Sequence, residues 1–303
     1  MKTRHFIDSM RIDADDVDRI FRCARLRHEL FRTFRDALRS RILLVHFGTR
    51  SFRTQLSFSS AFLRLGGSVI PAERDIFADS NDSDVADIAR QLHFYCDYAA
   101  IRSRDESLVP RLAEHSSIPI ISAGHGTQEH PSTALSHLFS ISERLQRLDN
   151  LRMLLIAKLP KRGIHSLIKL LRLYSNNEVV IRAPEDRRLP AEIEDAFRRG
   201  PGNRLRYVTS LNEVAAAGLD FICIDDAPSD FQPRPDIEGY WVPEITPGFL
   251  AQLSPTAFIT AGLPRTPTIP AWLDDDPRSH YVSKSLNSLY VRAAILLLLS
   301  GQL

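Results

Sequence analysis

The sequence predicts an α/β protein of two domains, each with a mainly parallel sheet flanked by helices. Short apolar segments of strand character alternate with amphipathic helical segments along most of the chain, which is typical of parallel α/β sheets. The alternation stops at a long helical segment that ends near residue 148, and it starts again near residue 151. A chain of 303 residues is long enough for two domains, each with its own core.

The first half of the chain opens with a helical segment. Asp13 can cap it, with Asp16 three positions further on in a variant of the capping box, and apolar residues then recur at helical spacing. The strands predicted after it are Ile42–Val45, Val69–Ile70, Tyr98–Ile101 and Ile118–Ile121. The helices predicted between and after these strands cover residues 56–65, Asp84–Tyr95, Ser107–His115 and Thr133–Leu148.

The second half repeats the pattern. Its predicted strands are Met153–Ile156, Glu178–Arg182, Asp220–Ile224 and Ala257–Thr260. Its predicted helices are His165–Tyr174, Ala191–Arg199 and a last one at about Lys284–Leu299. The proline-rich stretch from residue 228 to residue 270 is expected to be mostly loop.

The charge and cysteine content exclude several classes of protein. The 39 Lys and Arg residues nearly balance the 37 Asp and Glu residues, which gives no electrostatic case for nucleic acid or a membrane surface. Only five of these 39 basic residues are lysines. Cys23, Cys96 and Cys223 are an odd number without CxxC spacing, so we expect neither a disulfide framework nor a zinc site.

Targeting signals are also not expected. The first ten residues lack the apolar core of a secretory signal. The longest apolar run, Ala293–Leu299, is far shorter than the roughly 18 residues that suggest a membrane span. We therefore expect a cytoplasmic protein with no membrane partner.

The segment Phe47–Phe58 is the most informative for function. It lies between a predicted strand and the start of a helix, where backbone N–H groups point outward and the helix dipole favours an anion. Ser51 and Thr54 add hydroxyls, and Arg53 adds a guanidinium suited to phosphate oxygens. An ordinary helix cap followed by a solvated arginine explains this stretch about equally well.

Two other predicted strand ends have a similar character. Arg102 follows one strand, and His130, at the start of His130-Pro-Ser-Thr133, follows another and opens a helix. In open α/β sheets, ligands gather at the carboxyl ends of the strands. Taken alone, His130 is better explained as a loop cap. The coincidence of the three strand ends predicts a site for a phosphate and a carbonyl group.

These residues, in this order, resemble the aspartate/ornithine carbamoyltransferase family. That family has a Ser-Thr-Arg-Thr phosphate loop, an Arg after a following strand, a His-Pro-Thr-Gln motif and a Leu-Pro-Arg segment near the C-terminus. The matching segments here are Ser51-Phe-Arg53-Thr54, Arg102, His130-Pro131-Ser132-Thr133 and Leu263-Pro264-Arg265. The resemblance covers nearly the whole chain, and it implies an active-site cleft between the two domains.

The resemblance implies a role for each domain and for individual residues. Residues 1–148, completed by the helix 284–303, would bind carbamoyl phosphate or a similar anion, and residues 149–283 would bind an amine acceptor. The groups implied for carbamoyl phosphate are Ser51, the backbone N–H of Phe52, Arg53, Thr54, Arg102, His130, Thr133, Leu263 and Pro264. Catalysis would rest on His130, Thr54 and Arg53, with His130 as a neutral hydrogen-bond donor to the carbonyl oxygen. No metal or organic cofactor is implied.

The acceptor side departs from the family pattern. After the strand that ends at Ile224, Asp226 and Pro228 stand where the aspartate enzymes have Arg and Gln. Carboxylates at residues 225 and 226 would repel a carboxylate substrate and suit a basic or neutral amine. Arg162 is a candidate replacement for a carboxylate-binding Arg, and Arg265 is a further candidate for acceptor binding.

Other departures affect the carbamoyl phosphate side. Phe52 and Gln55 replace a Thr and an Arg, Thr133 replaces a Gln, and Gly262 belongs to Ala261-Gly-Leu-Pro-Arg265, where the family has His-Pro-Leu-Pro-Arg. In the family a mobile loop from the neighbouring subunit supplies a Ser and a Lys. The matching residues 72–84 contain no lysine, and Asn81 falls at the Lys position. This acidic stretch is either a solvated loop that has drifted or a lid that attracts a cationic group.

Two functions therefore stay open. The first is a carbamoyltransferase whose acceptor is an amine other than ordinary aspartate. The alternative is a catalytically inactive relative that serves as a scaffold or regulatory subunit. Because the family forms trimers with sites completed across the subunit interface, the resemblance also implies a homotrimer, and we expect no nucleic-acid partner.

Overall fold

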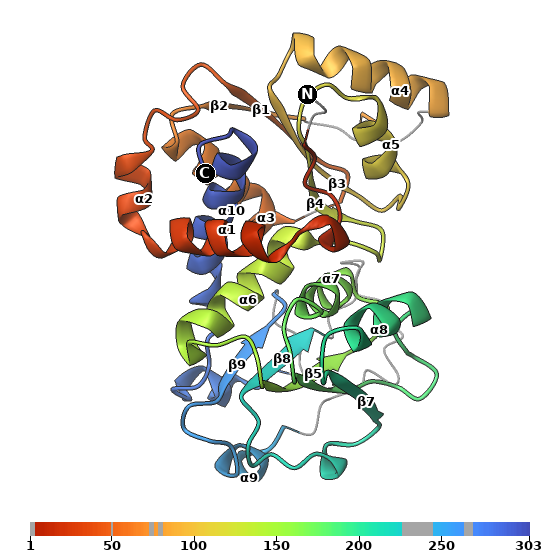
Figure 1. The fold of residues 1–303 in the computed structure, drawn as a ribbon, viewed down its shortest axis with the longest axis vertical. Helices are drawn as coiled ribbons and strands as arrows, with labels where there is room; N and C mark the ends of the chain where they lie inside the picture. The colour runs from red at the N-terminus through yellow and green to blue at the C-terminus, as the bar shows by residue number, and fades with distance from the viewer. Residues whose placement is uncertain (1–3, 50, 73–75, 78–80, 226–244, 264–268) are drawn as a thin grey trace. The chain divides into compact units, whose positions relative to one another are not determined.

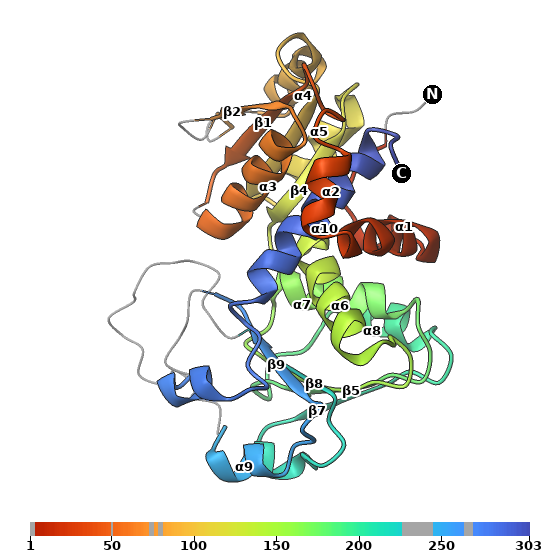
Figure 2. The ribbon, with the colours of Figure 1, turned by 90° about the vertical axis from the view of Figure 1, so that its left-hand side faces the viewer.

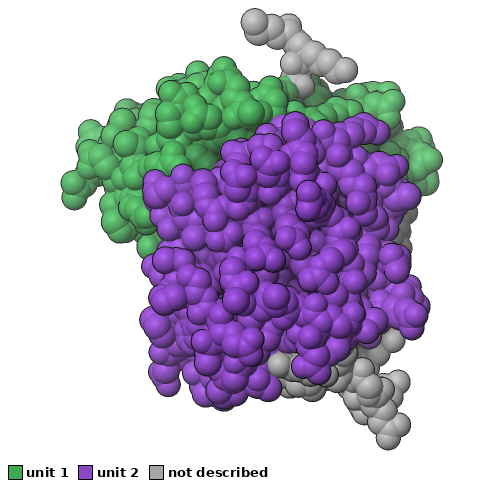
Figure 3. Space-filling view, turned by 60° about the horizontal axis from the view of Figure 1, so that its bottom comes forward, with its two compact units in different colours: residues 1–139, 285–303 green, residues 140–284 purple. Residues whose placement is uncertain are grey.

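The chain folds into two compact units. The computed structural model describes residues 4–49, 51–72, 76–77, 81–225, 245–263 and 269–303. One unit consists of residues 1–139 and 285–303, and the other consists of residues 140–284 (Figure 3). Each unit contains one parallel sheet flanked by helices, which confirms the predicted fold class.

The sheet of the first unit has four parallel strands in the order β2-β1-β3-β4 (Figure 1). Its strands are β1 (Ile42–Phe47), β2 (Ser68–Pro71), β3 (Tyr98–Ser103) and β4 (Ile120–His125). The continuous apolar runs of β1 and β3 fit strands that are covered on both faces. β2 lies at one edge of the sheet, and its residues are mostly exposed.

Helices cover both faces of this sheet (Figure 2). The helices of this unit are α1 (Ala14–Arg25), α2 (His28–Thr33), α3 (Phe52–Arg64), α4 (Asp82–Gln91), α5 (Leu108–His115), most of α6 (Pro131–Leu145) and α10 (Lys284–Leu299), with short 3-10 turns at Ser9–Arg11 and Leu92–Phe94. Successive residues of β3 point to opposite faces: the ring of Tyr98 meets Phe62 of α3 at 5.6 Å, whereas Ala99 joins the apolar cluster formed with α4 and α5. The sheet is therefore enclosed between α3 and the α4–α5 pair.

The helix cap expected at Asp13 is confirmed. The side chain of Asp13 accepts a hydrogen bond of 2.8 Å from the backbone N–H of Asp16 and caps α1. Helix α10, far from the rest of the unit in sequence, packs within it: Tyr290 contacts Phe31 of α2, and Arg292 contacts Ser57 of α3.

The sheet of the second unit has five parallel strands in the order β7-β6-β5-β8-β9. Its strands are β5 (Arg152–Ala157), β6 (Glu178–Arg182), β7 (Arg204–Val208), β8 (Phe221–Asp225) and β9 (Phe258–Ala261). Its helices are α7 (Arg162–Leu171), α8 (Ala191–Arg198) and α9 (Pro247–Ala251), with 3-10 turns at Leu211–Glu213 and Ala271–Asp275. One face of this sheet packs against α9 and these turns in a single apolar cluster.

The structure adds elements that the sequence pattern did not predict. Helices α2 and α9 are only six and five residues long, too short to show a helical period. Strand β7 lies at the edge of the sheet with one face in solvent, and its exposed Arg204 and Arg206 interrupt the apolar pattern. The predicted domain boundary, between residues 148 and 149, lies shortly after α6, whereas the compact units divide within that helix. Among the described residues, no helix is long and apolar enough to cross a membrane.

Candidate functional site

Three strand ends of the first unit bring the predicted anion-binding residues to one edge of the sheet. In the parallel register, Phe47 at the end of β1 pairs with Arg102 in β3, and Ser103 pairs with His125 at the end of β4. The chain leaves these ends through bonded turns: the Gly48 N–H donates to the Arg102 carbonyl at 3.0 Å. The loop before α3, the end of β3 and the loop before α6 therefore start side by side.

The loop after β1 leads directly into the N-terminus of α3. Ser51 occupies the N-cap position, and its hydroxyl makes no capping hydrogen bond. The first backbone N–H groups of a helix have no partner within it, so this turn can donate to an anion. The Thr54 side chain is buried, and Arg53 is half-buried. Burial lowers the pKa of the Arg53 guanidinium, and a bound anion would offset this cost.

Phe52 replaces a small residue of the family motif, so its position matters. Its side chain is 73% exposed. It therefore points into solvent from the first turn of α3 rather than packing into the unit. The backbone N–H that the resemblance assigns to residue 52 is independent of this side chain.

Arg102 is held rigidly at the end of β3. Its side chain is buried, its Nε donates to the Thr49 hydroxyl at 3.0 Å, and its Nη1 donates to the Ala123 carbonyl at 3.2 Å. These partners lie on the loop after β1 and on β4, the two neighbours of β3. A buried guanidinium fixed between the two loops suits the recognition of phosphate oxygens.

His130 ends the loop after β4 and immediately precedes α6. Its ring is buried, and its Nε2 lies 2.9 Å from the Thr133 hydroxyl, one turn into the helix. Pro131 is the first residue of α6, a position where proline is favoured because its fixed φ suits the helix. The same loop is held by Glu106, whose carboxylate accepts hydrogen bonds from the N–H and hydroxyl of Thr127.

The sequence reasoning missed Arg292 of α10 as a member of this site. It is buried, its guanidinium donates to the hydroxyls of Ser57 and Thr133, and it lies 5.2 Å from the Phe58 ring centre. Burial lowers the pKa of Arg292 to about 9. The available signal was a lone charge within the apolar run of the last helix, which indicates a buried and partnered cation.

The predicted acceptor residues belong to the second unit, where only part of the set is described. Asp226, Pro264 and Arg265 lie outside the described residues. Arg162 is the first residue of α7 and is half-buried, and Leu263 packs against the apolar cluster of the unit.

A charge pair lies at the carboxyl ends of the strands in this unit. The Nζ of buried Lys161, which follows β5, is 3.8 Å from Oδ1 of Asp225, the last residue of β8. Gly262 follows β9, and its N–H donates to the Ile224 carbonyl at 2.7 Å. Sequence reasoning noted Asp225 and Gly262 separately but did not foresee the pairing with Lys161.

Asn81, at the position of the family's loop lysine, has a structural role. Its side chain accepts a hydrogen bond from the Asp84 N–H at 3.1 Å, and the Asp84 carboxylate accepts one from the Asn81 N–H at 3.1 Å. This reciprocal capping box starts α4. Residues 73–75 and 78–80 of the same predicted lid lie outside the described residues.

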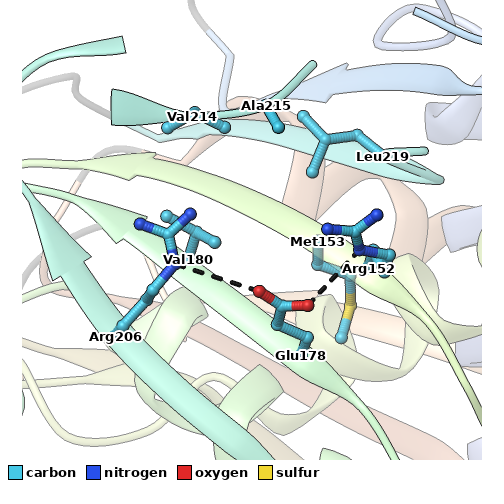
Figure 4. A pocket seen from close by; sticks show the side chains of 8 residues that line it. All are labelled: Arg152, Met153, Glu178, Val180, Arg206, Val214, Ala215 and Leu219. Atoms are coloured by element: carbon cyan, nitrogen blue, oxygen red, sulfur yellow. Dashed lines mark hydrogen bonds and ion pairs between the residues drawn. The ribbon is translucent and has the colours of Figure 1, made fainter. Parts of the chain in front are cut away.

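A pocket in the second unit lies at the opposite edge of its sheet, where β5 and β6 begin (Figure 4). Its lining residues are Arg152, Met153, Glu178, Val180, Arg206, Val214, Ala215 and Leu219. Glu178 lies between two of the arginines, 3.3 Å from Arg152 and 3.9 Å from Arg206. The charges that line this pocket already pair with each other. Among the described residues, no three His, Cys, Asp or Glu side chains gather as metal ligands do.

Comparison with known proteins agrees with the geometry. Residues 4–143 match the model of the aspartate/ornithine carbamoyltransferase carbamoyl-P binding domain. The aspartate carbamoyltransferase catalytic subunit of Clostridium botulinum (strain Langeland) is 30% identical over 305 residues, which cover 99% of both chains. That of Clostridium kluyveri is 28% identical over 314 residues, again with 99% of both chains covered.

Solved structures share the fold. Aspartate transcarbamoylase from Trypanosoma cruzi, solved in complex with carbamoyl aspartate and phosphate, superposes with a TM-score of 0.85 at 23% identity. The match covers 97% of this chain and 95% of the other. With the strand-end residues and a relative at 30% identity across the whole chain, the protein belongs to the aspartate/ornithine carbamoyltransferase family.

Proposed function

We propose that this protein transfers a carbamoyl group from carbamoyl phosphate to an amine acceptor. The observation that carries the proposal is the convergence of the α3 N-terminus, Arg102 and His130 at one edge of the first sheet. Relatives named as catalytic subunits of aspartate carbamoyltransferase support it, as do related structures that hold carbamoyl phosphate and aspartate. The reaction needs no cofactor in this proposal.

The described residues suit the chemistry on the carbamoyl phosphate side. Arg53, Arg102 and the first turn of α3 would hold the phosphate, while Thr54 and His130 would donate to the carbamoyl oxygen. The amine nitrogen forms a bond to the carbonyl carbon, and the bond from that carbon to the phosphate oxygen breaks. Phosphate leaves and takes up the proton that the amine loses. Because these donors are fixed before the reaction, they stabilise the developing oxyanion without rearranging.

The acceptor is proposed to be an amine other than ordinary aspartate. The Asp225 carboxylate lies 3.8 Å from Lys161, so it competes with a substrate carboxylate for that cation. Arg162 begins the helix after Lys161 and is the remaining described candidate for binding an acceptor carboxylate. Asp226 and Arg265 stay proposed acceptor residues on the family resemblance alone.

The domain roles and the assembly are proposed in the same way. Residues 1–148 with 284–303 would bind carbamoyl phosphate, joined by the backbone near Leu263 and Pro264, and residues 149–283 would bind the acceptor. A homotrimer is proposed because the family forms trimers. The exposed apolar side chains along α3 and β2 in the first unit support an interface there.

The test combines turnover with binding. Phosphate release from carbamoyl phosphate is measured with a panel of amines that includes aspartate, ornithine and neutral amines, and turnover of at least one is expected. Arg53→Ala should weaken carbamoyl phosphate binding in calorimetry by about 1.5–3 kcal/mol, the worth of a hydrogen bond to a charged group. Arg64→Ala, on the last turn of the same helix, is the control and should bind normally.

The outcomes separate the two functions. Background turnover for every amine would reject the transferase proposal. If carbamoyl phosphate still binds tightly in that case, the alternative of an inactive relative with a retained anion site is favoured. This alternative stays open because Asn81, at the position of the family's loop lysine, caps α4 instead. An unchanged affinity of Arg53→Ala for carbamoyl phosphate would mean that the loop before α3 only caps the helix and binds no anion.

A further inference from the structure

Arg292 is a buried cation that contacts both helices that follow the anion-site loops, α3 through Ser57 and α6 through Thr133. Within the described part of the chain, its polar partners are two hydroxyls, those of Ser57 and Thr133, and no carboxylate pairs with it. The face of Phe58 lies beside it, with the ring centre 5.2 Å away. A buried charge held by hydroxyls and an aromatic face costs more than one paired with a carboxylate. We therefore looked for a function that would justify burying this guanidinium.

On one side, Arg292 supports the start of α3. The Ser57 hydroxyl that accepts from Arg292 itself lies 2.7 Å from the Arg53 carbonyl and 3.0 Å from the Thr54 carbonyl. Since the guanidinium can only donate, the Ser57 hydroxyl hydrogen is available for these carbonyls. Arg292 therefore lies behind the turn that carries Arg53 and Thr54.

On the other side, Arg292 contacts the Thr133 hydroxyl, which is hydrogen-bonded to His130. Its Nη2 lies 3.5 Å from the Thr133 hydroxyl oxygen, which must accept because arginine has no acceptor. That oxygen lies 2.9 Å from Nε2 of His130, and the contacts of the described residues give the hydroxyl hydrogen no other acceptor. Arg292 then occupies one lone pair of the oxygen, and Nε2 is the acceptor at hand for the hydroxyl hydrogen. Both groups are satisfied when the Thr133 hydroxyl donates to an unprotonated Nε2.

We propose that Arg292 is a positioning residue that, through Thr133, holds His130 as the neutral tautomer with its proton on Nδ1. The Nδ1–H group is then the donor available for a carbonyl oxygen. Only the identity of that oxygen, the one in the carbamoyl group, rests on the proposed function. The arrangement depends on a threonine at residue 133, where the family has glutamine, so it belongs to this chain rather than to the family motif.

The ring ¹⁵N resonances of histidine report this tautomer directly. Protein labelled with [¹⁵N]histidine is measured at pH 7.5 by solid-state NMR, and the His130 signals are identified by their loss in His130→Gln. A protonated Nδ1 and an unprotonated Nε2 are expected. Protonation of Nε2, in either the other neutral tautomer or the imidazolium, would overturn the proposal.

Three variants test the relay itself. Thr133→Val removes the hydroxyl at nearly constant volume, and Arg292→Met removes the guanidinium that occupies one lone pair of that hydroxyl. In each variant, a protonated Nε2 should be detected in at least a fraction of the His130 signal. Thr133→Ser should restore the wild-type signals. Ser136→Ala removes another buried hydroxyl of α6 and should leave them unchanged. Wild-type signals in Thr133→Val would assign the tautomer to another contact and refute the relay, and this variant keeps the test decisive if Arg292→Met fails to fold.

Kinetics provide the second readout. With any amine that is turned over, Thr133→Val should lower kcat on the order of tenfold or more, and Thr133→Ser should recover most of the loss. If no amine is turned over, the proposed function fails while the NMR spectra still decide the tautomer. An unchanged kcat in Thr133→Val would show that the tautomer has no catalytic consequence and would reject the positioning role.

Discussion

A Cβ atom on Gly262 would lie 2.7 Å from Oδ1 of Asp225. The carboxylate of Asp225 therefore lies against the backbone just after β9, and this place is open only because residue 262 has no side chain. From there the same oxygen reaches to within 3.8 Å of the Lys161 Nζ. The glycine, the carboxylate and the ammonium form one arrangement at the carboxyl ends of β5, β8 and β9.

Gly262→Ala should disturb this arrangement without unfolding the protein. The group that the new methyl meets is the end of a side chain, and Gly262 is not among the residues with positive φ, so the Asp225 carboxylate can rotate away at little cost. We expect a change in the free energy of unfolding below about 1 kcal/mol and an altered KM for the acceptor. Urea unfolding and steady-state kinetics are the measurements.

Gly67→Ala is the matched control, because its Cβ would meet a Phe62 ring atom at 2.2 Å and the Arg41 carbonyl oxygen at 3.2 Å. Overpacking there should cost about 1–3 kcal/mol. If Gly262→Ala is destabilised as strongly as Gly67→Ala, the space beside Asp225 serves folding rather than the acceptor site.

Much of the fold could be predicted from the sequence because its strands are short apolar runs separated by helices with a clear apolar stripe. The predicted strand Glu178–Arg182 coincides with β6, and helix Lys284–Leu299 coincides with α10. Strand β7 could not be found this way, since exposed arginines interrupt its apolar pattern at the sheet edge.

Part of the candidate site could also be predicted from the sequence, and part could not. The placement of Ser51, Arg53, Arg102 and His130 at one edge of the sheet could be predicted, because each comes at or after the end of a strand and the carboxyl ends of parallel strands meet there. Arg292 could not, because its partners are hydroxyls on helices more than a hundred residues away in sequence. No local pattern records such a contact.

The cysteines should be unreactive in the folded protein. Burial raises the pKa of Cys23 to about 12, of Cys96 to about 11 and of Cys223 to about 12. At pH 8 almost none of these thiols is ionised, and the thiolate is the reactive form. An aromatic disulfide reagent should label none of the three in the native protein and all three in denaturant. Gln302→Cys, at an exposed position, supplies the positive control, and native labelling at its rate would contradict the prediction.

The ionised form of Asp276 should stabilise the folded protein at neutral pH, and this stabilisation should be lost in acid. Arg278 donates to its carboxylate twice, at 2.8 Å and 2.7 Å, and this pairing holds the pKa of Asp276 below its usual value. A group whose pKa is lower in the folded state stabilises above its unfolded pKa, about 3.9, and this contribution is lost as the pH falls through the folded pKa. The pair borders β9, since the Ile259 N–H donates to the Arg278 carbonyl at 2.7 Å.

Urea unfolding of Asp276→Asn between pH 2.5 and pH 7 tests this stabilisation. The variant should lose on the order of 1.5–3 kcal/mol near neutral pH, and the difference from wild type should shrink below about pH 4. The control Asp87→Asn breaks an exposed pair with Arg90 and should cost less than about 1 kcal/mol at every pH. A deficit in Asp276→Asn that does not depend on pH would mean that packing, not ionisation, explains the loss.

The exposed apolar face of α3 should be the subunit contact of the proposed trimer. Phe52, Leu56 and Leu63 are 73%, 51% and 55% exposed, and their spacing of four and seven residues places them along one side of the helix. Exposed Ile70 lies on the edge strand β2, which packs against α3. An open strand edge beside an apolar helix face is a surface that another chain can cover. Burying each of these side chains is worth about 1.5–3 kcal/mol, so charging the face should dissociate the assembly.

Light scattering on purified protein measures this dissociation. Wild type should have three times the 34.3 kDa mass of the chain, and Leu56→Glu/Leu63→Glu should shift it toward the monomer at micromolar concentration. Phe94→Ser, at a separate exposed aromatic residue, is the comparison and should keep the wild-type mass. A monomeric wild type would reject the trimer. The opposite result, in which Phe94→Ser dissociates and Leu56→Glu/Leu63→Glu keeps the wild-type mass, would place the interface at residue 94. An interface that buried residues 56 and 63 would not withstand two unpaired charges.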